Sequence, residues 1–280
     1  MEKTNYIINY FIKENEAKFS QETVRGYTIS LKQFFAFCQK EYDAVKTADI
    51  RDWLIELNSA GLKPRSISLK LASLRSFYRR LIENELISKN PTLDINSPKI
   101  EDYLPVYLGK ADLVQLMEAA KDHTRDRAVL ETLYATGVRA SELLNIRLED
   151  IKWDIRQIWI RKGKGNKERF VLFTAECAER LKHYLANRQI ESPYLFANRW
   201  GNPFSRVWLE KRLSRYAIGF NSRYKITPHT LRHTFAAHLS QKDMPQAHIQ
   251  ELLGHININT TKIYTRLQSI ARKKQYDSYQ

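Results

Sequence analysis

The sequence is poor in the features from which metal clusters, disulfide-bonded folds and membrane spans are built. Cys38 and Cys177 are its only cysteines, and neither has the spacing of a zinc ligand. We expect both thiols to be buried as apolar groups. No apolar run approaches the roughly 18–20 residues that cross a bilayer, and charges interrupt the apolar residues at the N-terminus. These absences predict a cytoplasmic protein.

The sequence also lacks the short motifs that hold nucleotides and metal ions. It contains no EF-hand loop, no P-loop and no dinucleotide-binding glycine pattern. We therefore expect no cofactor and no metal ion. Any chemistry must then be carried out by side chains alone.

Positive charge, by contrast, is in large excess. The formal net charge is +15, and most of the excess lies in residues 99–280. In the first hundred residues a cluster of basic side chains lies between residues 63 and 80, and no acidic residue occurs from Lys63 until Glu83. A strongly basic protein usually binds a polyanion, although a merely basic, soluble protein is the alternative.

Apolar residues recur at helical spacing through the first ninety residues. Stripes over 24–38, 50–57 and 67–81 repeat at intervals near 3.6 residues, and a shorter stripe includes Ile7 and Phe11. Ser20 is a candidate N-cap, Gly61 can end a helix and Pro64 can open one. The pattern predicts a four-helix domain over residues 1–89.

A proline-containing segment, residues 90–106, separates this domain from a second one, residues 107–280. Within the second domain, alternating residues at 158–161 and 170–173 predict a β-hairpin with a lysine at its tip. The rest reads as helices, at about 110–121, 125–136, 174–188, 205–219, 228–240, 245–253 and 258–274. The fold class is therefore mainly α with one small antiparallel sheet.

The helix expected over residues 64–82 has a second property. Its non-core faces carry basic and hydroxyl side chains, a combination that suits phosphates and base edges. We expect Arg65, Lys70, Arg75 and Arg79 to contact DNA, and Ser73 to lie on the same exposed faces. A solvated basic face is the alternative.

Four short segments carry the chemistry. They are ATGVRASELL (135–144), KGKGNKER (162–169), TPHTLRHTFAAHL (227–239) and LLGHININTTKIYTRL (252–267). Each is a weak signal alone. Together, and in this order, they resemble the tyrosine recombinase (phage integrase) family, with bacterial chromosome-dimer recombinases and transposon resolvases as the most similar members. The resemblance spans essentially the whole chain and implies a SAM-like N-terminal core-binding domain followed by a catalytic domain.

The resemblance also assigns roles, residue by residue, with no departure at any matched position. It implies that Tyr264 is the nucleophile and that Glu142 supports the site. The other catalytic positions that it implies are Arg139, Lys164, His229, Arg232 and His255. Lys162 and Lys167 flank Lys164 and are expected to hold backbone phosphates, with Lys162 as the alternative catalytic lysine. His233 and His238 are expected only to pack or cap.

These residue types suit attack on a phosphodiester. Its non-bridging oxygens are negative and become more so in the transition state, and the planar guanidinium groups of Arg139 and Arg232 donate paired hydrogen bonds to such oxygens. A tyrosine phenol has a pKa of about 10, so surrounding positive charge and a proton acceptor, His229, are needed. Lys164 then protonates the departing 5′ oxygen, and His255 donates to a non-bridging oxygen.

The resulting prediction is a site-specific recombinase that cleaves and rejoins DNA through a 3′-phosphotyrosyl intermediate, independently of ATP and metal. The resemblance implies double-stranded DNA at a specific site as substrate and a homotetramer on two duplexes, with accessory DNA-bound proteins as further partners. Dimer or cointegrate resolution and integration or excision of a mobile element all stay open as roles. The alternatives are a type IB topoisomerase and a non-catalytic DNA-binding protein on the same fold.

Overall fold

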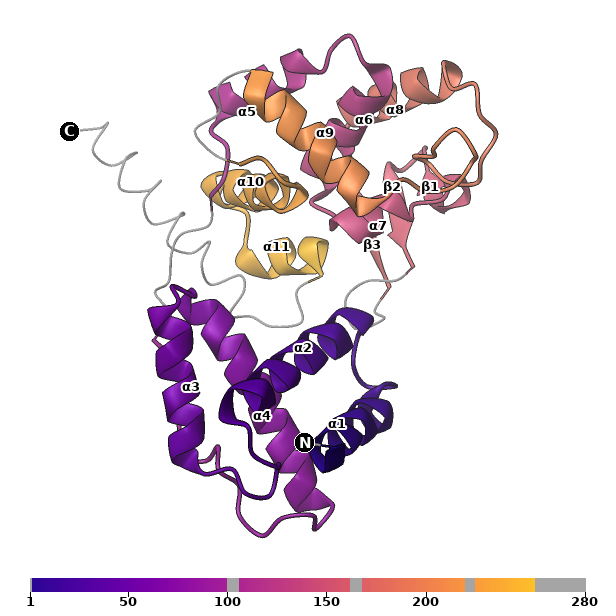
Figure 1. The fold of residues 1–280 in the computed structure, drawn as a ribbon. Coiled ribbons are helices and arrows are strands. Elements are labelled where there is room, and N and C mark those ends of the chain that lie inside the picture. The colour runs from indigo at the N-terminus through magenta and orange to yellow at the C-terminus, as the bar shows by residue number, and fades with distance from the viewer. Residues whose placement is uncertain (1, 100–105, 162–167, 220–224, 255–280) are drawn as a thin grey trace, which may run out of the picture. The chain divides into compact units, whose positions relative to one another are not determined.

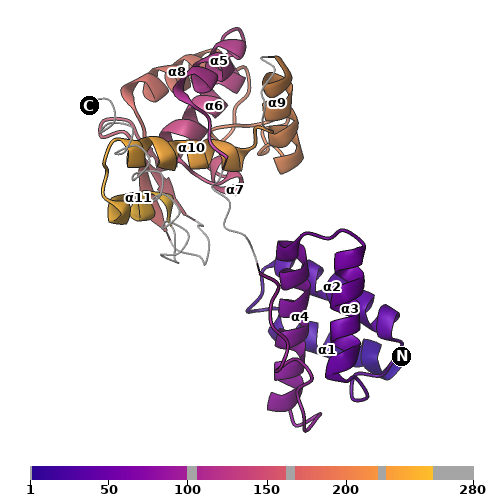
Figure 2. The ribbon, with the colours of Figure 1, turned by 90° about the vertical axis from the view of Figure 1, so that its left-hand side faces the viewer.

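The computed structural model describes residues 2–99, 106–161, 168–219 and 225–254 (Figures 1 and 2). The chain divides into two compact units, Met1–Asp102 (the first unit) and Tyr103–Gln280 (the second unit). Across the described residues, no helix combines the length and the apolar character that a membrane span requires.

The first unit is a bundle of four helices, as predicted. They are α1 (Glu2–Asn15), α2 (Gln21–Cys38), α3 (Thr47–Ser59) and α4 (Pro64–Glu83). Figure 2 shows α2, α3 and α4 side by side, and each of these helices packs against the other two. Their apolar stripes meet in an aromatic core that includes Phe11, Phe34, Phe35, Phe77 and Tyr78.

Local sequence signals set the ends of these helices. The hydroxyl of Ser20 accepts the backbone N–H of Thr23 at 3.1 Å and caps α2. Pro64 is the first residue of α4, where its missing N–H removes no helical hydrogen bond. The N-cap of α3 is Lys46, and the Asp49 carboxylate accepts its backbone N–H at 2.8 Å.

Part of the segment predicted as a linker packs against the first unit. The Ile95 side chain is buried in the aromatic core. Arg75 donates to the carbonyl of Ile95 and, at 2.8 Å, to the Ser97 hydroxyl. This guanidinium therefore fastens the chain that follows α4 to the helix itself.

The second unit is mainly helical. Its α-helices in the described part are α5 (Lys110–Ala119), α6 (Thr124–Thr136), α7 (Ala140–Leu144), α8 (Ala175–Ala186), α9 (Arg206–Gly219), α10 (Pro228–Gln241) and α11 (Gln246–Leu253). A 3₁₀ turn, η1 (Leu148–Asp150), precedes the sheet. The predicted helices are confirmed except that of 258–274, which lies outside the described residues. Cys177 is fully buried in this core, whereas Cys38 in the first unit is only half-buried.

The small sheet is antiparallel, with strand order β1–β2–β3. Its strands are β1 (Ile151–Lys152), β2 (Gln157–Ile160) and β3 (Arg169–Leu172), and Ile160 pairs with Arg169. The β2–β3 pair is the predicted hairpin. Sequence periodicity did not reveal β1 or α7, because two and five residues are too few to show a period.

We expect Ile95→Ala to lower the free energy of unfolding by about 2–5 kcal/mol, because it leaves a hole in a packed core. Leu93→Ala is the matched control. The Leu93 side chain is 75% exposed, so its removal should change the free energy of unfolding by about 0.5 kcal/mol or less. Urea unfolding followed by circular dichroism measures both. Equal effects would show that residues 91–97 do not pack on the helices as described.

Candidate active site

Three of the predicted site residues, Arg139, Glu142 and Arg232, gather around the C-terminal end of α11. In Figure 1, α11 lies below α10 and to the left of β3, and it packs against both. The last carbonyl groups of an α-helix have no partner within the helix and carry its negative dipole end. Cationic side chains are therefore favoured there.

Arg232 reaches this helix end from α10. It is 3% exposed, and its guanidinium donates from Nη2 to the Leu253 carbonyl and from Nη1 to the Gly137 carbonyl, both at 2.6 Å. Gly137 is the C-cap of α6, so a single side chain ties together the ends of two helices. The sequence explains where α10 begins, since Thr227 is its N-cap and Pro228 is its first residue.

Arg139 reaches the same helix end from the N-cap of α7. Its Nη2 donates to the Gly254 carbonyl at 3.1 Å, and its Nη1 donates to Glu142 Oε1 at 2.7 Å. Its backbone N–H donates to Glu142 Oε2 at 2.8 Å. The Arg139 side chain keeps 24% of its surface exposed, so the guanidinium is held without being closed off.

A third arginine, Arg169 at the start of β3, completes the cluster. Its Nε donates to the Leu252 carbonyl at 3.1 Å, and Nη1 and Nη2 donate to the two carboxylate oxygens of Glu142 at 3.0 and 2.8 Å. Sequence reasoning assigned no role to Arg169. The signal in the sequence that could have identified Arg169 is its place at the start of a predicted strand, directly after the turn that contains Lys164.

Glu142 is the negative centre of this cluster. Burial alone would raise its pKa, but the hydrogen bonds and charge of Arg169, followed by the hydrogen bonds of Arg139, lower it to about 2. The side chain is 1% exposed and ionised at neutral pH. It therefore accepts hydrogen bonds from both guanidinium groups as a full carboxylate.

His229 lies on α10 one turn before Arg232, and its side chain is exposed. Its ring meets that of His233 edge to face, with centroids 4.3 Å apart. Burial, then the charges of His229 and Arg232, lower the pKa of His233 to about 4, so this ring is neutral at pH 7. His238 is buried at the far end of α10, where its ring nitrogens contact the Tyr134 hydroxyl at 3.1 Å and the Leu108 carbonyl at 3.0 Å.

The remaining predicted catalytic residues, Lys164, His255 and Tyr264, lie outside the described residues, as do Lys162 and Lys167. The described part thus brings together Arg139, Glu142 and Arg232, with His229 on the same helix as Arg232. These groups come from two segments, residues 139–142 and 229–232, that are far apart in the sequence.

The predicted DNA-contact residues of α4 differ in their surroundings. Arg65 and Arg79 are exposed, whereas Lys70 and Arg75 are half-buried with protein partners. The Lys70 ammonium donates to the Gln33 side-chain oxygen, and burial lowers its pKa. Ser73 was placed on the exposed faces, and this is wrong: it is fully buried, and its hydroxyl donates to the Lys70 carbonyl at 2.6 Å.

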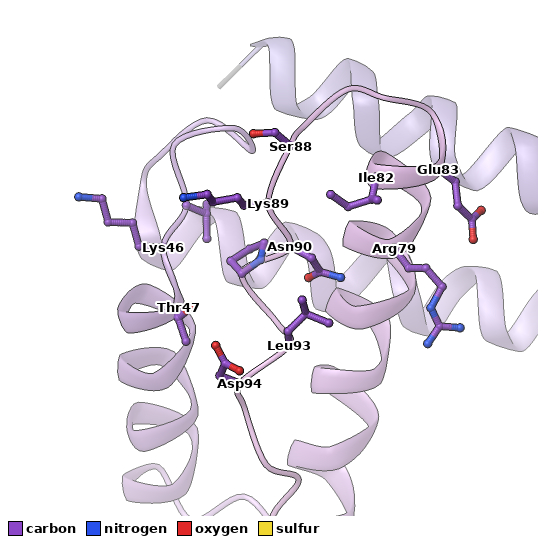
Figure 3. A pocket seen from close by; sticks show the side chains of 12 residues that line it. Lys46, Thr47, Arg79, Ile82, Glu83, Ser88, Lys89, Asn90, Leu93 and Asp94 are labelled. Atoms are coloured by element: carbon purple, nitrogen blue, oxygen red, sulfur yellow. The ribbon is translucent and has the colours of Figure 1, made fainter.

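A hollow of about 730 Å³ lies in the first unit, between the start of α3, the end of α4 and residues 88–94 (Figure 3). Lys46 and Arg79 stand on opposite sides of it. Its lining also includes Glu83, Lys89 and Asp94. The lining therefore carries charges of both signs, and Arg79 is part of it.

Two family models match the chain. The phage integrase family matches residues 107–269, and the phage integrase N-terminal SAM-like domain matches residues 8–85. The chain belongs to the phage integrase family. The match covers the second unit from before α5 and includes every predicted catalytic position.

Relatives in this family are similar along nearly their whole length. A tyrosine recombinase XerC of Thermodesulfovibrio yellowstonii is 37% identical over 94% of this chain and 91% of its own. A tyrosine recombinase XerC of Staphylococcus carnosus is 36% identical, over 99% and 96% respectively.

Solved structures of recombinases share the fold. The crystal structure of XerA recombinase has a TM-score of 0.58 and 28% identity, covering 99% of both chains. XerH site-specific recombinase bound to a palindromic difH substrate, a post-cleavage complex, has a TM-score of 0.77 over 91% of this chain and 79% of its own, at 23% identity. The second likeness concerns the fold alone.

The low pKa of Glu142 predicts how its contribution to stability varies with pH. A carboxyl whose pKa falls from 4.5 to about 2 on folding stabilises the protein above pH 4.5, and this stabilisation is lost as the pH falls toward 2. We expect Glu142→Gln to destabilise the chain by on the order of 3 kcal/mol at pH 6 and much less near pH 2.5.

The matched control is Glu118→Gln, which removes a carboxylate that is 62% exposed and pairs with Lys121. It should have little effect at either pH. Urea unfolding at the two pH values measures both variants. A Glu142→Gln effect that does not depend on pH would contradict the described ion cluster.

The backbone conformation and close packing of Gly137 predict that its substitution destabilises the protein. Its φ is +61°, and a Cβ atom there would lie 2.4 Å from Cδ1 of Phe235. Gly61 has φ +78° with open space around it, so Gly61→Ala meets the left-handed strain alone. We expect Gly137→Ala to lower the free energy of unfolding by about 1–3 kcal/mol more than Gly61→Ala does. Equal losses in thermal unfolding would mean that Phe235 does not pack on Gly137.

Proposed function

We propose that this chain is a site-specific DNA recombinase that cuts and rejoins DNA strands through a covalent bond between Tyr264 and a 3′ phosphate. The observation that carries the proposal is the convergence of Arg139 and Arg232 on consecutive carbonyls, those of Gly254 and Leu253. Two guanidinium groups from distant segments are thereby fixed next to each other. In the sequence, His255 directly follows Gly254, and Tyr264 lies nine residues further on.

The two arginines suit the phosphate of the scissile bond. A pentacoordinate transition state concentrates negative charge on non-bridging oxygens, and prearranged guanidinium groups stabilise that charge without reorganising. Arg232 is almost fully buried and Arg139 is partly exposed. We assign Arg232 to the base of the phosphate site and Arg139 to its open side.

Proton transfers complete the reaction. His229 accepts the phenol proton of Tyr264, and the phenolate attacks phosphorus to form a 3′-phosphotyrosyl bond. Lys164 protonates the departing 5′ oxygen, and His255 donates to a non-bridging oxygen. A 5′ hydroxyl of another strand then attacks the phosphotyrosine and releases Tyr264. Each step exchanges one phosphodiester for another, so neither ATP nor a metal ion is required.

DNA contact is assigned to both domains, which we divide as residues 1–89, a linker over 90–106 and residues 107–280. Arg65 and Arg79 are exposed on α4 and available to phosphates, and Lys162 and Lys167 flank Lys164. Arg75 and Lys70 combine a DNA role with the protein contacts described above. By analogy with λ integrase, solved as a tetramer on a Holliday junction, we propose a homotetramer on two duplexes, acting in the cytoplasm with accessory DNA-bound proteins.

A nicked duplex whose sequence around the nick is randomised tests the chemistry for any target sequence. Cleavage near the nick releases a short strand, so the covalent adduct accumulates. We expect the wild-type chain to form an adduct that survives boiling in detergent and forms in EDTA, and whose sequencing reveals a preferred site. Tyr264→Phe should abolish it, and Arg139→Ala and Arg232→Ala should reduce it at least about 100-fold.

Tyr276→Phe is the control, because it removes another phenol from the C-terminal segment and should leave the adduct yield unchanged. An adduct formed by Tyr264→Phe at wild-type yield would assign the nucleophile to another residue. Relaxation of supercoiled plasmids that lack the selected site would instead favour a type IB topoisomerase.

A further inference from the structure

The Arg169 side chain makes several hydrogen bonds to protein groups. Its three nitrogen atoms each donate to a protein acceptor, Nε to the Leu252 carbonyl and the two Nη atoms to Glu142. The side chain is 12% exposed. These contacts hold the guanidinium of Arg169 in place from both of its edges.

The charges of the cluster indicate that Arg169 compensates the charge of Glu142. Glu142 accepts from Arg139 at 2.7 Å and from Arg169 at 2.8 Å, with its carboxylate almost fully buried. A buried Arg139–Glu142 pair alone would be neutral and would do little to stabilise the additional negative charge that develops on the phosphate in the transition state. Arg169 compensates the charge of Glu142, so that Arg139, Glu142 and Arg169 together have a net charge of +1.

Arg169 also connects this ion cluster to α11. The three guanidinium groups of the site take consecutive carbonyls, Arg169 that of Leu252, Arg232 that of Leu253 and Arg139 that of Gly254. Gly254 has φ +63°, and a Cβ atom there would lie 3.0 Å from Cδ, Nε and Cζ of Arg169. The helix end and the Arg169 side chain therefore fit closely against each other.

We propose that Arg169 is a positioning residue for DNA cleavage, which offsets the negative charge of Glu142 so that the charge of Arg139 acts on the phosphate, and which holds the Arg139–Glu142 pair at the end of α11. The inference rests on the proposed recombinase function. Residue 255 follows this helix end, so the same contacts fix the point from which the chain continues to His255 and Tyr264. Loss of Arg169 should thus slow cleavage while leaving the DNA-binding surfaces intact.

The test compares cleavage rate with DNA affinity on the nicked duplex selected with the wild-type chain. Affinity is measured in the Tyr264→Phe background, so that cleavage does not interfere. We expect Arg169→Met to lower the single-turnover cleavage rate at least about 100-fold, and Arg169→Lys about 10-fold, because lysine keeps the charge and loses the two-point geometry. Affinity should change less than about threefold, since no phosphate contact is removed.

Arg127→Met is the matched control. Arg127 is also 12% exposed, pairs with a buried carboxylate, Glu131, and donates to a helix-end carbonyl, that of Met117, at 2.8 Å. Its removal disturbs a similar ion pair away from the end of α11. We expect it to lower stability without slowing cleavage at saturating protein.

A second substitution separates charge from simple loss of packing. In the Arg169→Met background, Glu142→Gln removes the uncompensated negative charge beside Arg139, and we expect it to restore several-fold of the lost cleavage rate. Failure of this rescue would overturn the charge role.

A wild-type cleavage rate in Arg169→Lys and Arg169→Met would overturn the proposal as a whole, and so would equal losses of rate and affinity. An absence of adduct with the wild-type chain would instead refute the proposed function, so the two failures are distinguishable.

Discussion

The carbonyl groups at the end of α11, which have no hydrogen-bond donor within the helix itself, constrain the rest of the site. Three of them accept from three guanidinium groups that the chain delivers from α7, β3 and α10. A helix end inside a protein must find such donors, because an unsatisfied buried carbonyl destabilises the fold. Here the donors are side chains whose charge also suits a phosphate, so the requirement of the fold and the requirement of the chemistry are met by the same contacts.

This constraint explains why segments so distant in sequence act together. Arg232 joins the ends of α6 and α11, and Gly137 must be a glycine because Phe235 packs against its Cα. Glu142 then joins Arg139 to Arg169. An ion cluster of this kind is rigid because each member has more than one partner. Rigidity of the arginines is what electrostatic stabilisation of a transition state requires.

Sequence predicted most of the fold because most of its elements are long and periodic. The four helices of the first unit follow from apolar stripes, and Ser20 and Pro64 fixed the ends of two of them. The elements that it missed, β1 and α7, are too short for a period. Ser73 was misplaced because a small hydroxyl residue fits either face of a helix, and its burial depends on the helices that surround α4.

The site was predictable only in part. Motif resemblance assigned Arg139, Glu142 and Arg232, and the structure brings these three together. The contacts of Arg169 depend on strand register and on the position of α11, neither of which a local motif encodes. For the same reason the helix carrying Arg75 was predicted correctly, while the Ile95 carbonyl that its guanidinium binds was not.

Mass spectrometry of the trypsin-digested DNA adduct tests the central claim most directly. Trypsin cuts after Lys262 and Arg266, so the short peptide 263–266 contains a single tyrosine, Tyr264. The account predicts that the nucleotide remnant is attached to this peptide through a phosphodiester to the phenol oxygen. A remnant on any other peptide, with peptide 263–266 unmodified, would contradict it.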